Sequence, residues 1–107
     1  MKRFGQVLQL KPECINEYVK YHADVWPGVL AQIKKSNIQN YSIFLQDNVL
    51  FAYFEHTGND FEQDMKKMAL DAETQRWWAV MEPMQEKWAT ASAEEWWCNM
   101  TEVFHLE

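Results

Sequence analysis

The segment NIQNYSIFLQDNVLFAYFEH (37–56) decides the fold class, because two runs of strand-forming residues flank a turn. The runs 37–46 and 49–56 are rich in aromatic and aliphatic side chains, which favour strands. Asp47 and Asn48, between them, are residues that form tight turns. The sequence therefore predicts a β-hairpin at the centre of the chain.

Both faces of this hairpin are apolar. Successive side chains of a strand point to opposite faces of its sheet. Leu50, Ala52 and Phe54 alternate with Val49, Phe51 and Tyr53, while Tyr41, Ile43 and Leu45 alternate with Asn40, Ser42 and Phe44. A large bare apolar face is unfavourable in a monomer, so we expect one face to pack against the same face of an identical chain. The sequence predicts a homodimer formed through the sheet face.

The N-terminal half predicts one strand and two helices. These are a strand over 3–10, a helix begun by Pro12 and a shorter helix begun by Pro27. The first helix has one inward face with the i, i+3, i+4, i+7 spacing, made of Ile15, Tyr18, Val19 and His22. Both helices therefore lie between the first strand and the hairpin.

The C-terminal half predicts, in order, a helix over 59–70, a helix over 71–88, a loop over 89–95 and a final strand over 96–107. Asp71 is a suitable N-cap, and Pro83 is expected to end or kink the second helix. The resulting order, β-α-β-β-α-β, predicts an α+β protein of the ferredoxin-like class, with an antiparallel sheet and helices on one face. We expect a single domain, 1–107, that pairs with a second copy as a dimeric α/β barrel.

Composition and charge exclude several function classes. The chain has 107 residues, 48% of them hydrophobic and 15% aromatic, which is enough to build a core. Its net charge is −6, and Lys and Arg form no basic patch, so nucleic acid is not an expected partner. No apolar run is long enough for a membrane span, so we expect no membrane partner either.

The cysteines do not indicate a metal site or a disulfide framework. Cys14 and Cys98 are far apart in the sequence and belong to no Cys/His cluster. With no signal peptide in the sequence, the expected location is the cytoplasm.

His22 is the first candidate for chemistry. It follows Tyr18 by four residues, so the two side chains share one helix face. The ordinary pKa of histidine lies near neutrality, which suits proton transfer. The simpler interpretation is a core histidine bonded to a carbonyl, because buried histidines are often only structural.

The adjacent Trp77 and Trp78 are the second candidate. Neighbours on a helix point ~100° apart, so the two indoles do not share one narrow stripe. One indole is expected to enter the core and the other to form a wall for the apolar face of a ligand such as a sugar. The sequence does not indicate which is which, and both indoles could simply belong to the core.

The remaining polar candidates have plainer interpretations. Glu102, on the final predicted strand, is the carboxylate that could act as a base. Arg76 is expected at the surface in an ion pair, and His56 and His105 are expected to be structural or exposed.

Five segments of the chain resemble the L-rhamnose mutarotase family. They are EYVKYHADVWPGVLAQI (17–33), NYSIFL (40–45), LFAYFE (50–55), TQRWWAVM (74–81) and MTEVFHL (100–106). The resemblance covers nearly the whole chain in the same order. Its H-x-x-x-W-P and Q-R-W-W elements are rare combinations and make it specific.

This resemblance implies a fold, an activity and a site. The family is a ferredoxin-like, sheet-to-sheet dimer that uses no cofactor and no metal, and it interconverts the α and β pyranose anomers of L-rhamnose. The chain would then be an isomerase whose partner is a small neutral monosaccharide. The resemblance assigns His22 as proton donor and assigns substrate contacts to Tyr18, Tyr41, Trp77 and Trp78.

Mutarotation matches these residue types. The reaction needs a proton delivered to the ring oxygen while one leaves the anomeric hydroxyl, which positioned side chains can do at neutral pH. The base stays open between Glu102, Tyr18 and a bound water. The segment ASAEEWWCNM (91–100) resembles only a subset of relatives, so L-fucose or another 6-deoxy sugar stays open as the substrate.

Two other function classes share this expected fold. Cofactor-free monooxygenases of the dimeric ferredoxin-like class would use the aromatic pocket for an aromatic substrate. A non-catalytic binding module would use the tryptophans as an interface, and replacing His22 would then leave its function intact.

Overall fold

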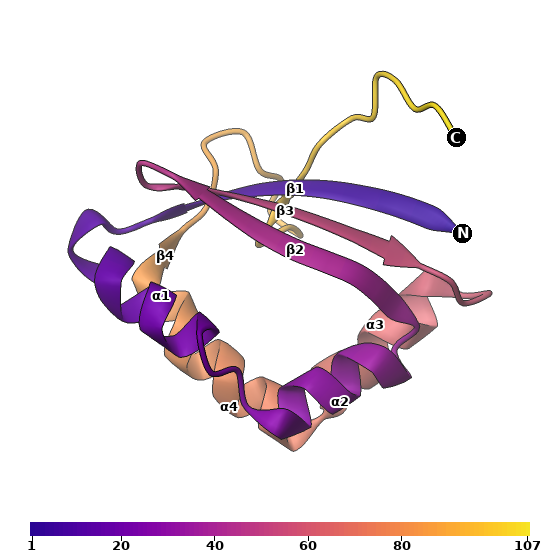
Figure 1. Cartoon of the computed structure of the whole chain (residues 1–107), viewed down its shortest axis with the longest axis horizontal. Coiled ribbons are helices and arrows are strands. Elements are labelled where there is room, and N and C mark those ends of the chain that lie inside the picture. The colour runs from indigo at the N-terminus through magenta and orange to yellow at the C-terminus, as the bar shows by residue number, and fades with distance from the viewer.

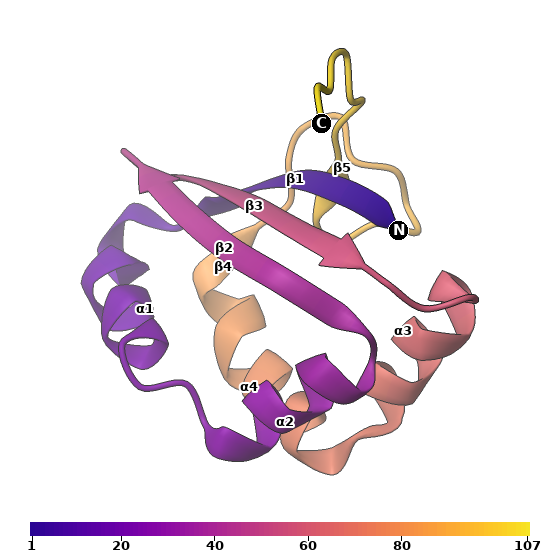
Figure 2. The same ribbon diagram turned by 45° about the vertical axis from the view of Figure 1, so that its right-hand side comes forward.

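The computed structural model describes all 107 residues as a curved sheet with four α-helices on one side (Figures 1 and 2). The elements are β1 (Lys2–Leu10), η1 (Pro12–Cys14), α1 (Ile15–His22), α2 (Pro27–Lys35), β2 (Ile38–Gln46), β3 (Val49–His56), α3 (Phe61–Leu70), α4 (Ala72–Met81), η2 (Glu82–Met84), β4 (Gln85–Glu86) and β5 (Cys98–Asn99). This arrangement confirms the prediction of an α+β protein.

The sheet is antiparallel throughout, with the strand order β2-β3-β1-β4. The short β5 also pairs with β1, through Gln6 and Val7, while β4 pairs with Gln9 and Leu10 further along the same strand. At the opposite side of the sheet β2 is an edge strand with β3 as its one neighbour. The predicted hairpin is confirmed.

Two left-handed residues shape the hairpin. Asp47 has φ 55° in the turn, a conformation that Asp and Asn tolerate better than most residues. Asn40 has φ 50° at a β-bulge, where the register shifts between Gln39 and Ser42. Because a bulge bends its strand and re-aims side chains, it turns Tyr41 toward the helices.

The helix boundaries follow the signals in the sequence. The Asp60 side chain accepts a hydrogen bond from the backbone of Gln63 at the start of α3, and Asp71 accepts one from Thr74 at the start of α4. Pro27 begins α2, and α4 ends at Met81 just before Pro83. None of these helices has the combined length and hydrophobicity that crossing a bilayer would require.

The core lies between the helices and the inner face of the sheet. Its buried cluster consists of Leu8, Leu10, Tyr18, Val29, Leu50, Trp77, Met81 and Met84. A separate cluster of polar side chains lies between the end of β3 and α3. There His56 Nε2 lies 2.7 Å from Asp64 Oδ2, and the Asn37 side chain donates a hydrogen bond to the same oxygen at 2.9 Å. Only 16 of the 107 residues are buried, which is a small core for the chain.

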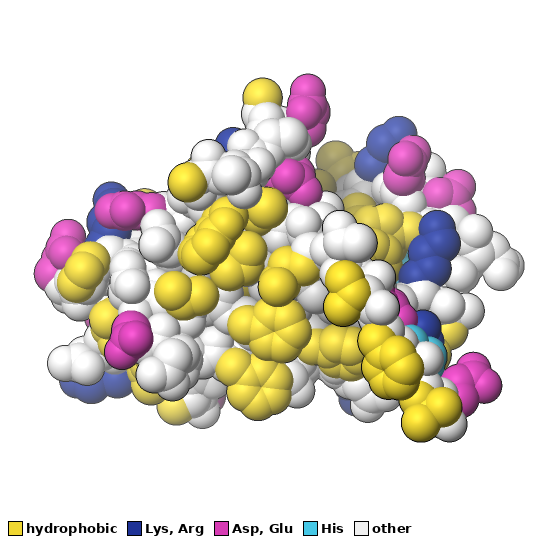
Figure 3. Space-filling model, turned by 90° about the horizontal axis from the view of Figure 1, so that it is seen from above, with side chains coloured by type: hydrophobic (Ala, Val, Ile, Leu, Met, Phe, Trp, Pro, Cys, Tyr) yellow, Lys and Arg dark blue, Asp and Glu magenta, His cyan; other side chains and the backbone are white.

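The outer face of the sheet is uncovered. Phe44 is 59% exposed and stacks on Phe51 in the next strand, with ring centroids 6.2 Å apart. Figure 3, which looks down on this face, shows hydrophobic atoms gathered across it. The chain exposes 7318 Å², about 1,000 Å² more than the ~6,300 Å² expected for a compact monomer of its mass. Both faces of the hairpin are therefore apolar, as the sequence predicts.

The prediction of a final strand over 96–107 is wrong. Only Cys98–Asn99 forms a strand, and the rest of the chain projects from the outer side of the sheet (Figures 1 and 2). The backbone N–H of Met100 still donates to Gly5 of β1, but residues 101–107 make no backbone hydrogen bond, although the Glu102 side chain still reaches Arg3 of β1. Val103, Phe104 and Leu106 are at least three-quarters exposed. A strand needs hydrogen bonds to a neighbouring backbone along its length, and residues 101–107 make none.

The helix predicted over 71–88 is too long. Pro83 cannot continue an α-helix, so the chain passes through η2 and leaves it as the short strand β4. Gln85 therefore lies in the sheet, beside Leu10 of β1.

Candidate active site

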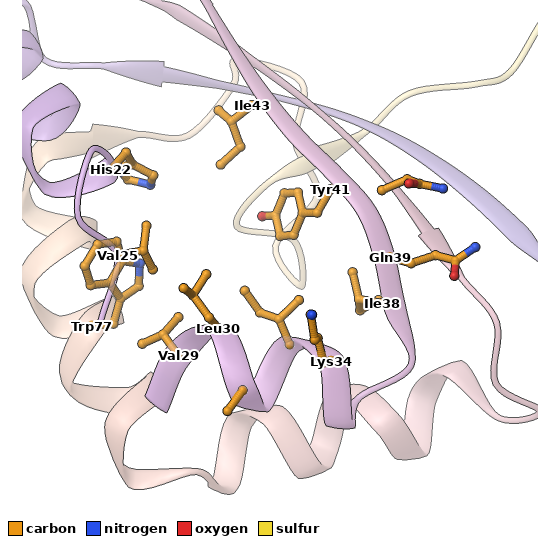
Figure 4. Close-up of a pocket in the computed structure, with 13 residues that line it drawn as sticks. His22, Val25, Val29, Leu30, Lys34, Ile38, Gln39, Tyr41, Ile43 and Trp77 are labelled. Carbon is orange, nitrogen blue, oxygen red and sulfur yellow. The ribbon is translucent and has the colours of Figure 1, made fainter. Parts of the chain in front are cut away.

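A cavity of about 690 Å³ opens between the end of α1, the helix α2 and the edge strand β2 (Figure 4). Its volume falls within the ~300–1,000 Å³ typical of small-molecule sites. Aliphatic side chains from α2 and β2 form most of the wall. The polar lining residues are His22, Lys34, Gln39 and Asn40, with the hydroxyl of Tyr41 among them.

His22 is held with one ring nitrogen free. Its Nδ1 lies 2.9 Å from the backbone carbonyl oxygen of Tyr18. A carbonyl oxygen only accepts, so Nδ1 carries a hydrogen and Nε2 has no partner within the chain. Burial lowers the pKa of His22 below its ordinary value, and the bond to the Tyr18 carbonyl partly opposes that shift. The ring can therefore exchange a proton with a molecule in the cavity through Nε2.

Tyr18 lies behind His22, where it is 4% exposed and does not line the cavity. The two rings stack with centroids 4.2 Å apart, as their four-residue spacing on α1 predicts. The Tyr18 hydroxyl accepts a hydrogen bond from Gln85 Nε2 at 3.1 Å. Burial raises the pKa of Tyr18 to about 12, and the Gln85 bond opposes that rise. Tyr18 therefore keeps its proton at neutral pH.

Tyr41 reaches the cavity from the opposite side. The bulge in β2 directs its ring inward, and Figure 4 shows its hydroxyl pointing into the cavity. Burial, together with the neighbouring Tyr18, raises the pKa of Tyr41 to about 12. Two phenol groups that remain protonated thus accompany the His22 imidazole.

The tryptophan pair divides between two environments. Trp77 lines the cavity and meets His22 edge-on, with ring centroids 5.3 Å apart. Trp26 supports Trp77 from the side in a second edge-on contact at 5.1 Å. Trp78 is partly buried against the core and does not line the cavity. Of the pair, Trp77 is the indole available to a ligand in this cavity.

Glu102 does not join this group. It lies in the projecting C-terminal segment and forms an ion pair with Arg3, 3.1 Å away, at a second and smaller hollow. The expectation that Glu102 stands on a strand is wrong, because β5 ends at Asn99. Within one chain it is not placed to take a proton from a ligand beside His22.

The other polar candidates have structural surroundings. Arg76 pairs with Glu73 on the surface of α4, as expected. His56 is buried in its pair with Asp64, and His105 is exposed. No three His, Cys, Asp or Glu side chains are grouped closely enough to hold a metal ion.

The sequence does not single out two residues that lie near Tyr18. Gln85, taken for part of a helix, instead contacts the Tyr18 hydroxyl, and Trp96 donates from its indole nitrogen to Gln85 Oε1 at 2.7 Å. Pro83 was the available signal, because a chain that leaves a helix there can return to the sheet. Nothing in the sequence indicates that the loop of Trp96 folds back toward β4.

Comparison with known proteins identifies the family of the chain. The model of the family described as L-rhamnose mutarotase matches residues 3–106. A protein named L-rhamnose mutarotase from Oceanobacillus iheyensis is 38% identical over the full length of both chains, and one from Bacillus subtilis is 32% identical, also over the full length of both. The crystal structure of L-rhamnose mutarotase from Formosa agariphila has the same fold, with a TM-score of 0.77, 23% identity and full coverage of both chains. The chain therefore belongs to the L-rhamnose mutarotase family.

Proposed function

We propose that the chain is an isomerase that interconverts the α and β pyranose anomers of L-rhamnose by acid/base ring opening, without a cofactor. Membership of the family supports the reaction. The observation that carries the mechanism is the free Nε2 of His22, which faces a cavity also lined by Tyr41 and Trp77. Tyr18, stacked behind the imidazole, completes the group.

The proton moves through His22. The protonated imidazole gives its Nε2 proton to the ring oxygen as the bond from that oxygen to the anomeric carbon breaks. The anomeric hydroxyl loses its own proton, and the sugar becomes an open-chain aldehyde. Rotation about the bond between the first and second carbons presents the other face of the aldehyde. The same steps in reverse close the ring and return the proton to His22.

The acceptor for the anomeric proton is a water molecule in this proposal. Tyr18, with a pKa of about 12, holds its proton too tightly to be the base. Glu102 is paired with Arg3 away from the cavity. Of the three candidates for the base, water is the one that the geometry of a single chain favours.

The lowered pKa of His22 makes its protonated form a stronger acid but reduces the amount of that form at neutral pH. Burial makes the imidazolium a stronger acid than histidine in water, because the charged form is poorly solvated. Tyr41 lines the cavity and serves as a neutral hydrogen-bond donor to a sugar hydroxyl, and Trp77 offers an aromatic surface to the carbon-bound hydrogens of the ring. Tyr18, buried behind His22, is the second proposed donor.

The lining favours a 6-deoxy sugar. The aliphatic wall includes Val29, Leu30 and Ile33 of α2 and suits a methyl group better than a hydroxymethyl group. An uncharged substrate also meets no penalty from the net charge of −6. L-rhamnose is the proposed substrate, and L-fucose or another 6-deoxy sugar is the alternative.

We propose the assembly as a homodimer of one 107-residue domain, packed through the outer face of the sheet as a dimeric α/β barrel. The strand order β2-β3-β1-β4 with helices on one side supports the ferredoxin-like description. The exposed Phe44 and Phe51 on the outer face support its burial by a second copy. The two free cysteines, Cys14 and Cys98, support a reducing compartment such as the cytoplasm.

Saturation-transfer NMR tests the reaction. One anomeric proton of L-rhamnose is saturated and the signal of the other anomer is followed with and without protein. Transfer that requires the protein supports the proposal, and repetition with L-fucose, D-glucose and D-ribose ranks the substrates. Oxygen consumption with an aromatic substrate, in the absence of sugar exchange, would instead indicate the monooxygenase class.

A further inference from the structure

We infer that Gln85 and Trp96 are positioning residues that fix the Tyr18 hydroxyl as a hydrogen-bond donor toward the sugar. The three side chains form a chain of two hydrogen bonds, from the Trp96 indole to Gln85 and from Gln85 to Tyr18. The inference rests on the proposed function, in which Tyr18 contacts the substrate.

The indole sets the orientation of the amide. An indole nitrogen only donates, so the atom of Gln85 that lies 2.7 Å from Trp96 Nε1 is the carbonyl oxygen. The amide nitrogen of Gln85 must then face the other way, toward Tyr18. With Trp96 in place, the opposite orientation of the amide would set two donors against each other.

The amide in turn sets the direction of the tyrosine bond. Gln85 Nε2 carries only hydrogens and donates to the Tyr18 oxygen at 3.1 Å. The hydroxyl hydrogen of Tyr18 is not used in that bond, and Gln85 is the one hydrogen-bond partner of this hydroxyl within the chain. That hydrogen has no acceptor within the chain. Tyr18 is 4% exposed and does not itself line the cavity, so a sugar oxygen must reach this hydrogen past the His22 ring that stacks on Tyr18.

Gln85 is held by the sheet, and Trp96, although 38% exposed, stands in a loop that is held by hydrogen bonds. Gln85 is 7% exposed and lies in β4, where its backbone is paired with Leu10. The loop that carries Trp96 is braced by the Glu95 carboxylate, which accepts from the backbone N–H groups of Ser92 and Asn99. These contacts lower the pKa of Glu95, so its bracing charge persists at neutral pH.

Through these hydrogen bonds the segment 91–100 can influence substrate binding without contacting the substrate. The segment does not line the cavity, yet Trp96 connects it to Tyr18 through a single amide. A change in this loop would therefore alter sugar binding through the direction of one hydroxyl.

The decisive variant is Gln85→Glu, assayed by NMR anomer exchange. At neutral pH the introduced carboxylate accepts from both Trp96 and Tyr18, so the Tyr18 hydrogen turns away from the sugar. We expect kcat/KM to fall about tenfold, mainly through KM, because a hydrogen bond to the substrate is lost. The ratio of variant to wild-type activity should recover as the pH falls through the pKa of the introduced carboxyl, because a protonated carboxyl can donate as the amide does.

Three further variants separate positioning from simple structural support. Tyr18→Phe should lower activity, and adding Gln85→Glu to it should cause no further loss. Trp96→Phe frees the amide to rotate and should lower kcat/KM about threefold. Trp97→Phe is the matched control, because Trp97 makes no side-chain hydrogen bond and should retain wild-type KM.

The inference would be overturned if the activity losses of Tyr18→Phe and Gln85→Glu added up in the double variant. It would also be overturned if the activity loss of Gln85→Glu did not change with pH. Equal effects of Trp96→Phe and Trp97→Phe would overturn it as well. If the wild-type protein fails to exchange anomers, the proposed function is wrong. Ultraviolet titration of the tyrosines then tests separately whether Gln85 contacts the Tyr18 hydroxyl as inferred. Gln85→Glu should raise the pKa of one phenol, and that change should be missing in the Tyr18→Phe background; an unchanged titration would overturn the inference.

Discussion

Replacement of Phe44 by serine should dissociate the proposed dimer. Phe44 is 59% exposed on the outer face of β2 and stacks on Phe51. A buried Phe covers ~200 Å², so a second copy would bury roughly 120 Å² more of each ring, worth ~3 kcal/mol at ~25 cal/mol per Å². Serine retains little of this area.

The effect counts twice because a two-fold interface contains Phe44 from both chains. A loss of roughly 4–6 kcal/mol corresponds to a dissociation constant about 10³- to 10⁴-fold weaker. The ~1,000 Å² of excess surface per chain would give ~2,000 Å² in total, an area typical of stable homodimers.

Sedimentation equilibrium measures this directly, since one chain has a mass of 12.8 kDa and a dimer twice that. Leu70→Ser is the matched control, because Leu70 is 79% exposed at the end of α3, on the helix side of the sheet. A wild-type chain that sediments as a monomer, or a Leu70→Ser variant that dissociates as readily as Phe44→Ser, would show that the outer face of the sheet does not hold two copies together.

Three other predictions concern the site and the fold. If protonated His22 is the acid, kcat/KM, corrected for the uncatalysed rate, should rise as the pH falls toward the lowered pKa of His22 and should level off below that pKa. A rate that rises with pH through this range would instead assign His22 as a base. Trp77→Phe should raise KM for L-rhamnose, while Trp78→Phe should change only the melting temperature, and the reverse pattern in a kinetic assay would place the sugar elsewhere. Asp64→Asn should lower the melting temperature at pH 7, because the substitution removes the negatively charged carboxylate that forms hydrogen bonds with Asn37 and His56. These bonds lower the pKa of Asp64, so their stabilisation is present above its ordinary pKa and lost as the pH falls through the lowered value; a difference in melting temperature from wild type that persists at acid pH would contradict this.

Local signals in the sequence predicted most of the fold. The hairpin, the N-caps Asp60 and Asp71 and the prolines at helix boundaries all act over a few residues, so they can be read without knowing the rest of the structure. The final strand could not be settled in this way. Residues 100–107 have a strand-like composition, but after Met100 they leave β1 without forming further backbone hydrogen bonds, which composition alone does not indicate.

The candidate site was predictable in part for the same reason. His22 stacks on Tyr18 because both lie on one helix, so their spacing was informative. Gln85 and Trp96 meet Tyr18 only because β4 and the following loop fold back beside β1, which no local pattern indicates. Glu102 was placed beside the site on the assumption of a strand that does not form.

The most direct test of the account is saturation transfer between the anomers of L-rhamnose, measured for wild type and for His22→Ala at equal concentration and pH. The wild-type protein should transfer saturation well above the protein-free rate. The variant should fold, judged by circular dichroism, yet lose roughly 10²-fold or more of the catalysed rate, as expected when a positioned acid is removed. A folded His22→Ala variant that exchanges the anomers as fast as wild type would contradict the central claim.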